Sequence, residues 1–197
     1  DGSPLNRVAK VMPPGNSWAG SGKGKTIAYR TNSIADSVRL FTINISSEED
    51  IPASSVFYLP GTLYVQEIID ESGNKTITYT DETGKQILSK TQLVINPNTA
   101  YTGWLCTYFV YDEMNKLRFV IPPKATELLV ASVWNVQANL AAIKNLCYSY
   151  YYDALGRVVT KCLPAKGKTY LIYDANSKVV LSQDSVLRAT SQWQFVK

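Results

Sequence analysis

The sequence predicts a mainly β fold, built from antiparallel hairpins that stack in one sheet. Three observations predict it. A short turn motif recurs along the chain, alternating apolar segments flank its copies, and the composition is rich in tyrosine (13 residues) and in β-branched residues. An internal repeat of this kind indicates a supersecondary unit that buries its apolar face against the next copy of itself.

The turn motif contains a tyrosine, an aspartate, then Gly, Asn or Ser three residues after the aspartate, followed by Lys or Arg. A carboxylate at the first turn position can accept hydrogen bonds from nearby backbone N–H groups, and Gly or Asn at the fourth position tolerates a positive φ. We therefore expect a type I turn closed by a left-handed residue and a bulge, with Ser177 as the poorest match. The structural turn residues are Asp81 and Gly84, Asp112 and Asn115, Asp153 and Gly156, and Asp174 and Ser177.

A tyrosine precedes each of these turns, and we expect the four rings to pack on equivalent residues of the neighbouring hairpin rather than to form a binding site. The four residues are Tyr79, Tyr111, Tyr152 and Tyr173. Two weaker copies of the motif lie at residues 3–7, with Ser3 in the place of the aspartate, and at residues 69–75, which keep Asp70 and Gly73.

The whole chain, 1–197, is interpreted as a single fragment of a repeat region. Residues 1–62 form an irregular strand and loop part with the first repeat, and residues 63–197 form stacked hairpins. In residues 124–146 the apolar spacing changes from two residues to about 3.6, which predicts a helical insertion. There we expect one short helix at about 135–146, and a turn of helix after Pro123.

The composition excludes several classes of function. A net charge of +4 that comes from scattered Lys and Arg predicts no nucleic-acid partner. The absence of histidine removes the commonest general base and metal ligand, so we expect no metal site and no cofactor. The three cysteines, without a C-x-x-C pair, fit buried small apolar residues. No apolar run approaches the roughly 18 residues of a membrane span, and both ends of the chain resemble cuts in a longer protein.

Candidate chemistry is sparse. Residues 20–26 resemble a phosphate-binding loop, but Ala19 stands where the pattern needs glycine and a strand-like segment follows. The turn aspartates are expected to serve their turns rather than acid–base catalysis, and the acidic run from Glu48 to Asp50 to be solvated. Trp18 and Trp134 lie in insertions and are the candidate sugar-stacking residues, with core packing as the alternative for every tryptophan.

The repeats resemble the YD-repeat or Rhs-repeat family of large bacterial surface or secreted proteins, named for their Tyr-Asp dipeptide. Tyr111-Asp112, Tyr152-Asp153-Ala-Leu-Gly156-Arg157 and Tyr173-Asp174 carry the match. Leu5-Asn6-Arg7-Val8 with Met12-Pro-Pro-Gly15, and Phe119-Val-Ile-Pro-Pro123-Lys124, resemble variants in Bacteroides-type members. The resemblance implies a curved or spiralling sheet of hairpins that forms a hollow shell, which in some members encloses an effector polypeptide. Shell closure there involves a self-cleaving segment with an Asp-Pro motif, and this chain has no Asp-Pro dipeptide.

We therefore expect a non-catalytic scaffold segment of a secreted or cell-surface protein, which forms part of a shell wall. Its partners would be neighbouring repeats of the same polypeptide, together with self-association through exposed strand edges. A carbohydrate-binding surface module is the alternative, and hydrolysis by paired carboxylates is a third hypothesis. The enclosed effector or ligand, the type of parent protein and the oligomeric state do not follow from the sequence.

Overall fold

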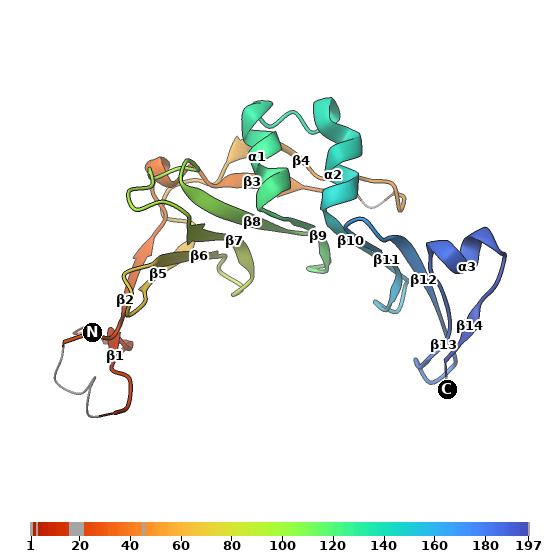
Figure 1. The fold of residues 1–197 in the computed structure, drawn as a ribbon, viewed down its shortest axis with the longest axis horizontal. Coiled ribbons are helices and arrows are strands. Elements are labelled where there is room, and N and C mark those ends of the chain that lie inside the picture. Colours follow the sequence, from red (N-terminus) through yellow and green to blue (C-terminus); the bar gives the residue numbers. More distant parts are fainter. Residues whose placement is uncertain (1, 3, 16–21, 45, 197) are drawn as a thin grey trace. The chain divides into compact units, whose positions relative to one another are not determined.

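The computed structural model describes residues 2, 4–15, 22–44 and 46–196. The protein is mainly antiparallel β, with three α-helices in these residues and a large sheet that is not closed (Figure 1). This confirms the mainly β class that the alternating segments predict. The chain forms two compact units, residues 1–39 with 57–106, and residues 40–56 with 107–197. These units follow spatial contacts and are distinct from the sequence parts 1–62 and 63–197.

In the first unit, antiparallel neighbours follow one another in the order β1-β2-β5-β6-β7. A 3-10 turn, η1 (Ile34–Asp36), follows β2, and Tyr79 and Leu88 are fully buried in the core of this unit. The strands are β1 (Lys10–Val11), β2 (Lys25–Thr31), β5 (Tyr64–Ile69), β6 (Lys75–Thr80) and β7 (Gln86–Gln92).

The second unit contains the strand order β9-β10-β11-β12-β13-β14, and most of β8, which pairs with β9. A two-stranded sheet of β3 (Arg39–Thr42) and β4 (Ala53–Phe57) lies mainly in this unit. The longer sheet consists of β8 (Trp104–Tyr111), β9 (Leu117–Ile121), β10 (Tyr148–Tyr152), β11 (Val158–Leu163), β12 (Gly167–Tyr173), β13 (Val179–Gln183) and β14 (Gln194–Phe195).

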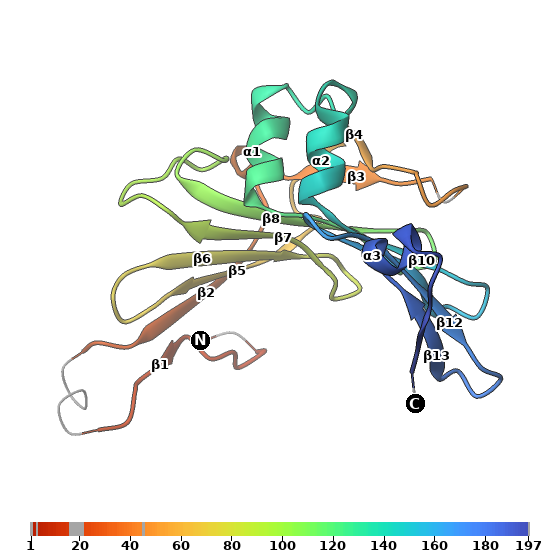
Figure 2. The same cartoon turned by 45° about the vertical axis from the view of Figure 1, so that its right-hand side comes forward.

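Helices α1 (Pro123–Ala131) and α2 (Leu140–Leu146) connect β9 to β10 and lie side by side in both cartoon views (Figures 1 and 2). Leu129 of α1 and Ile143 of α2 are fully buried, so both helices place an apolar stripe inward. A 3-10 turn, η2 (Gln137–Asn139), leads into α2. The helical insertion after Pro123 is thus present.

The expectation of one short helix is wrong in number. Helix α1 spans nine residues where only a turn was expected, since Pro123 at its start presets the helical φ. Left-handed residues at Val133 (φ 54°) and Trp134 (φ 63°) then separate α1 from η2. Helix α3 (Ser185–Ala189) is too short for a periodic signal and begins because the Asp184 carboxylate caps two N–H groups.

The register between successive hairpins is constant in the second unit. Phe119, seven residues after Asp112, pairs with Ser149, four residues before Asp153. Thr160 pairs with Tyr170 at the same two offsets from Asp153 and Asp174, and Leu181, seven residues after Asp174, pairs with Phe195. A bulge precedes each turn at the equivalent place, between Val110 and Tyr111, Tyr151 and Tyr152, and Ile172 and Tyr173. Because the turns and bulges are equivalent, successive hairpins pair in an equivalent register.

Candidate functional site

The hairpin turns share one backbone geometry. Between β10 and β11, the Gly156 N–H donates to the Asp153 carbonyl at 2.9 Å, and Gly156 has a φ of 75°. The Asp153 carboxylate accepts the N–H groups of Leu155 and Arg157 at 3.0 and 2.9 Å, which holds the pKa of Asp153 below its ordinary value. The equivalent residues Gly84, Asn115 and Ser177 have φ values of 82°, 63° and 62°. The turn carboxylates are therefore engaged by the backbone of their own turns.

Asp112 has a second role. Its carboxylate accepts the Lys116 N–H at 2.8 Å and the Arg118 Nε at 2.7 Å, and both members of this ion pair are buried. Arg118 also donates to the Tyr150 carbonyl at 3.2 Å and lies 5.3 Å from the Tyr152 ring centre. The first hairpin of the second unit is thus connected to the next strand through a buried guanidinium.

Two tyrosines bind the preceding hairpin in the same way. The Tyr152 hydroxyl donates to the Leu117 carbonyl at 2.8 Å, and the Tyr173 hydroxyl donates to the Val158 carbonyl at 2.7 Å. Leu117 and Val158 each lie five residues after a turn aspartate, so the two bonds are equivalent. We call these contacts the tyrosine ladder. The basic residue before each acceptor faces the same ring, with Arg157 4.8 Å from Tyr173 and Lys116 5.9 Å from Tyr152.

Tyr79 does not belong to this ladder. It stands two residues before Asp81, whereas the other motif tyrosines directly precede their aspartates. Because side chains alternate along a strand, Tyr79 turns to the opposite face. It is fully buried there, and its hydroxyl donates to the Asp36 carboxylate at 2.7 Å. The motif groups Tyr79 with the other three tyrosines, and the one extra residue before Asp81 is the sequence difference that places it on the other face.

The Asp36 carboxylate is the centre of a buried cluster in the first unit. It also accepts two hydrogen bonds of 2.7 Å from Arg30 and one of 2.7 Å from the Ser33 N–H. Burial favours protonation, but these donors outweigh it and lower the pKa of Asp36. Burial and the bond to Asp36 raise the pKa of Tyr79. Asp36 is therefore a fixed anion that attaches η1 to β2 and β6.

Lys90 lies in the same cluster with no exposed surface. Its ammonium donates to the carbonyls of Asp36, Thr99 and Ala100 at 3.0, 3.0 and 2.7 Å, and Tyr79 lies 5.3 Å away. Burial lowers the pKa of Lys90 to about 8. The three bonds use all three ammonium donors, so Lys90 holds the 99–100 segment against η1. No sequence pattern indicated this contact, since an alternating strand predicts only that Lys90 faces one side.

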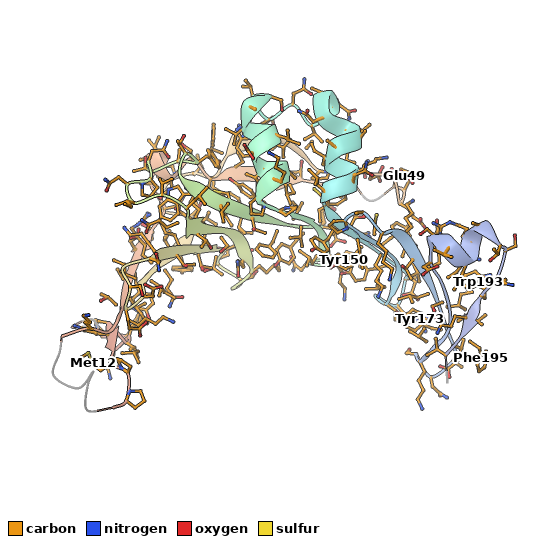
Figure 3. The ribbon with its side chains drawn as sticks, viewed as in Figure 1. Met12, Glu49, Tyr150, Tyr173, Trp193 and Phe195 are labelled. Atoms are coloured by element: carbon orange, nitrogen blue, oxygen red, sulfur yellow. The ribbon has the colours of Figure 1, made fainter. Side chains whose placement is uncertain are left out.

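The acidic run in the loop between β3 and β4 is paired rather than solvated. Glu49 accepts hydrogen bonds from Lys144 of α2 at 2.7 Å and from Lys168 of β12, and Glu48 accepts the Thr160 hydroxyl at 3.1 Å. These lysines lower the pKa of Glu49 to about 2. We call residues 46–50 the acidic strap. It borders a cavity of about 20 Å³ beside Arg118 and Tyr150, and Figure 3 shows Glu49 near α2.

Trp134 lines an open pocket of about 280 Å³ in the second unit. The polar groups around it are neutral hydroxyls and amides, and no charged residue is among its lining. Trp134 is half-buried and packs edge-on with Phe41 and Tyr108, with ring centres 5.9 Å apart in both pairs. The lining consists of Thr42, Ile51, Pro52, Ala53, Ser54, Ser55, Trp134, Asn135, Val136 and Gln137.

The backbone at this pocket is strained. Val133 and Trp134 are consecutive non-glycine residues with positive φ, and Val133 is β-branched and 83% exposed. Strain of this kind costs of the order of 1–3 kcal/mol and occurs preferentially at functional sites. Trp18, the other sugar-stacking candidate, lies outside the described residues. Trp134 is therefore the candidate that the structure places beside an open pocket.

The remaining candidate features can be located in the described residues. Within the described part of the chain, no three His, Cys, Asp or Glu side chains group as metal ligands would, and no helix is long and apolar enough to cross a membrane. Cys106 and Cys147 are buried thiols, and Cys162 is half-buried. The phosphate-loop-like stretch leads directly into strand β2 rather than a helix. No protein-family model and no curated protein matches this sequence.

Proposed function

We propose that this chain is a non-catalytic β-repeat scaffold segment of a large secreted or cell-surface bacterial YD/Rhs-repeat protein. Its function would be to form part of a curved shell wall, with enclosure of an effector polypeptide as the role of the shell. The observation that carries the proposal is the tyrosine ladder, in which equivalent hydroxyls bind equivalent carbonyls of the preceding hairpin. A contact that recurs from hairpin to hairpin suits a wall built by repetition.

The constant register supports the same proposal. The β9–β10 and β11–β12 junctions use the same two offsets from the turn aspartates, and the β13–β14 junction shares the offset of its first strand from Asp174. A further hairpin can therefore pair with the preceding one in the same strand register. The turn carboxylates accept backbone N–H groups and so hold the shape of each loop. The tyrosines beside them hydrogen-bond to the preceding hairpin and so hold neighbouring strands together.

The test is cryo-electron microscopy of the parent polypeptide, with the reading frame on both sides of this segment determined first. We expect further hairpins that continue the sheet with the same tyrosine-to-carbonyl contact. An Asp-Pro-containing core followed by a variable carboxy-terminal domain would assign the shell to toxin delivery, and a signal peptide with more repeats would assign it to a surface scaffold. An isolated domain tethered by flexible linkers, with no adjoining hairpins, would overturn the proposal.

Carbohydrate binding is a second candidate, favoured by the pocket at Trp134. An aromatic ring beside neutral hydroxyl and amide groups suits a saccharide, which offers an apolar ring face and many hydroxyls. We expect neutral oligosaccharides on a glycan array to bind the wild-type chain and to bind Asn135→Ala and Gln137→Ala more weakly. Both residues are exposed and neither belongs to the aromatic cluster, although the Asn135 side chain accepts the Ala138 N–H at 3.1 Å, so Gln137→Ala is the variant that removes no side-chain hydrogen bond among the described residues. Absence of binding across the array would reject this candidate.

A further inference from the structure

Strand β4 has one edge that no described strand occupies, since it pairs only with β3 in the two-stranded sheet. Tyr58, directly after β4, donates its N–H at 2.8 Å to the carbonyl of Val38, directly before β3, so the two strands run antiparallel. Because backbone groups alternate along an antiparallel strand, the N–H and C=O groups of Ala53 and Ser55 turn away from β3. These groups form an open row to which another strand can hydrogen-bond.

The neighbours of β4 in sequence do not cover this edge. Strand β3 pairs with the other edge of β4, and β5 pairs with β2 and β6 in the long sheet. Both strands that adjoin β4 along the chain therefore have positions elsewhere. The edge is open to a separate extended segment rather than to the next strand of the chain.

The open pocket of Trp134 reaches this edge. Its lining includes the successive residues Ala53, Ser54 and Ser55. Since successive side chains of a strand point to opposite faces, a pocket that touches three in a row extends to the edge of the strand as well as to its face. Strand β4 lies beside α1 and α2 in both cartoon views (Figures 1 and 2). A strand added to β4 would therefore place one of its side chains at the pocket.

The chemistry around the pocket favours an uncharged, partly apolar ligand. Residues 51–57 and 130–137 include no Lys, Arg, Asp or Glu. Val56 and Val133, which adjoin lining residues in sequence, are 52% and 83% exposed. Burial of a charge against such a surface is costly, whereas an apolar side chain gains from burial. A row of free backbone groups beside a pocket for a side chain is the arrangement by which sheet edges recognise extended peptides.

Val133 supports a binding role at this rim. The N–H groups of Val133 and Trp134 donate to the carbonyls of Val130 and Leu129 at 3.2 and 2.6 Å, which is the pattern of a Schellman cap at the end of α1. The left-handed residue of such a cap is usually glycine, yet Val133 adopts it with a φ of 54°. An exposed β-branched side chain at this place costs stability without being buried, so a contact with a bound partner accounts for its presence.

We propose that β4 and the Trp134 pocket bind an extended, uncharged peptide segment, which adds to β4 as a further strand and places one apolar side chain in the pocket. This inference goes beyond the scaffold function and does not depend on it. Absence of peptide binding would leave the scaffold proposal standing, and a parent protein without adjoining hairpins would leave peptide binding standing. The pocket is shared with the saccharide candidate, and the two ligand classes are separated by the test.

NMR titration of the 197-residue chain with the end-blocked peptide Thr-Val-Thr-Phe-Thr-Val-Thr tests the proposal. We expect saturable binding with a dissociation constant of the order of 1 mM, because ordering a short flexible peptide offsets much of the interaction free energy. The amides of Ala53 and Ser55 should shift and exchange more slowly with solvent as the peptide is added. The amides of β1 should not change.

Two N-methylated forms of this peptide test strand addition on the wild-type chain, without a variant that has to fold. Methylation of either the odd or the even residues removes the N–H donors from one edge of the peptide and leaves those of the other edge. One form should bind as the parent peptide does and the other should lose binding, because only one edge can face β4. Equal binding of both forms, or equal loss, would overturn the proposal.

Variants of the protein test the same contact from the other side. Ser55→Pro removes one N–H from the free edge and leaves the pairing with β3, so the dissociation constant should rise about tenfold or more. Ser55→Thr keeps the N–H and is the matched control, with an expected change of less than about twofold. Val133→Gly should raise the thermal midpoint, because glycine accepts a positive φ, and should raise the dissociation constant about threefold through the lost apolar contact.

Three results would overturn the proposal. One is the absence of saturable binding, and another is an equal dissociation constant for Ser55→Pro and Ser55→Thr. The third is a shift of the Trp134 resonances by a neutral oligosaccharide but not by the peptide, which would assign the pocket to the saccharide candidate instead.

Discussion

The hydroxyl of Tyr173 donates a hydrogen bond of 2.7 Å to the main-chain carbonyl of Val158, across the junction between two hairpins. Tyr152 repeats this bond at 2.8 Å on Leu117. In both cases the acceptor residue follows a basic side chain that lies against the ring of the same tyrosine. The motif therefore links each hairpin to the preceding one through its first strand, while its aspartate shapes the turn. One short sequence specifies both a loop and a junction.

Tyr173→Phe and Tyr152→Phe should each lower the free energy of unfolding by about 1 kcal/mol, because the ring remains and only the hydrogen bond is lost. Urea denaturation followed by tryptophan fluorescence measures the change. Tyr148→Phe is the matched control, since Tyr148 is 37% exposed at the start of β10, and it should change stability by less than about 0.5 kcal/mol. Equal losses of unfolding free energy in all three variants would show that the two ladder hydrogen bonds do not stabilise the fold.

Substitutions at the left-handed turn position should have opposite signs. Ser177 has a φ of 62°, so Ser177→Gly should raise the free energy of unfolding by up to about 1 kcal/mol, less the loss of its 3.3 Å bond with Arg157. Gly156→Ala should lower it by about 1 kcal/mol or more, because its φ of 75° is unfavourable for alanine and a Cβ would approach Lys116 Nζ to 3.0 Å. Thermal unfolding of the two variants beside wild type checks the signs.

Local patterns predicted the strands and turns well. Alternating apolar residues and the Asp-x-x-Gly or Asp-x-x-Asn turns mark the hairpins, because both signals depend on residues close in sequence. Helix α1 is longer than the single turn that the sequence predicts, and α3 is not predicted at all, for different reasons. Helix α3 is five residues long, and the apolar stripe of the insertion, Val136, Leu140, Ile143 and Leu146, begins only after α1 ends.

The clusters around Asp36 and Glu49 could not be predicted because their partners are distant in sequence. Lys90 donates to the Asp36 carbonyl across 54 residues, and Lys168 pairs with Glu49 across 119. By itself, neither an acidic run in a loop nor a lysine in a strand predicts a particular contact. The packing of loops against strands brings these charges together, and only the folded chain shows it.

The acidic strap should release in acid and at high salt. Bonds from Lys144 and Lys168 lower the pKa of Glu49 from 4.5 to about 2, so its contribution to stability is present above pH 4.5 and lost as the pH falls toward 2. The protection of the amides of residues 46–50, taken relative to the intrinsic exchange rate at each pH, should therefore fall over this range at low salt. It should also fall in 1 M NaCl at pH 7, because the Debye length there is only about 3 Å and exposed ion pairs are weakened.

In Glu49→Gln the strap amides should have low protection at pH 7, and this protection should change little further in acid or in 1 M NaCl. Glu127→Gln is the matched control, since Glu127 forms an exposed pair with Lys124 in α1 and does not touch the strap. A strap that exchanges equally fast in wild type and Glu49→Gln at pH 7 would show that the two lysines do not hold it.

Removal of Lys90 should destabilise the protein at pH 7 and destabilise it further above pH 8. Lys90→Met leaves three carbonyls without their buried donor, so we expect a loss of about 2–4 kcal/mol at pH 7, measured by urea denaturation. Burial lowers the pKa of Lys90 from 10.5 to about 8. Between these values the unfolded chain binds more protons than the folded chain, so the lysine's contribution to stability rises with pH.

The stability difference between wild type and Lys90→Met should consequently grow from pH 8 to pH 10, with a slope that approaches about 1.4 kcal/mol per pH unit. Burial raises the pKa of Cys106 to about 11 and the charge of Lys90 opposes that rise, so the thiol lowers stability with rising pH more steeply in Lys90→Met and adds to the difference in the same direction. Lys178→Met, at an exposed lysine in a hairpin turn, is the matched control. A constant difference for Lys90→Met would mean that Lys90 titrates as an ordinary lysine and that its carbonyl cage is open to water.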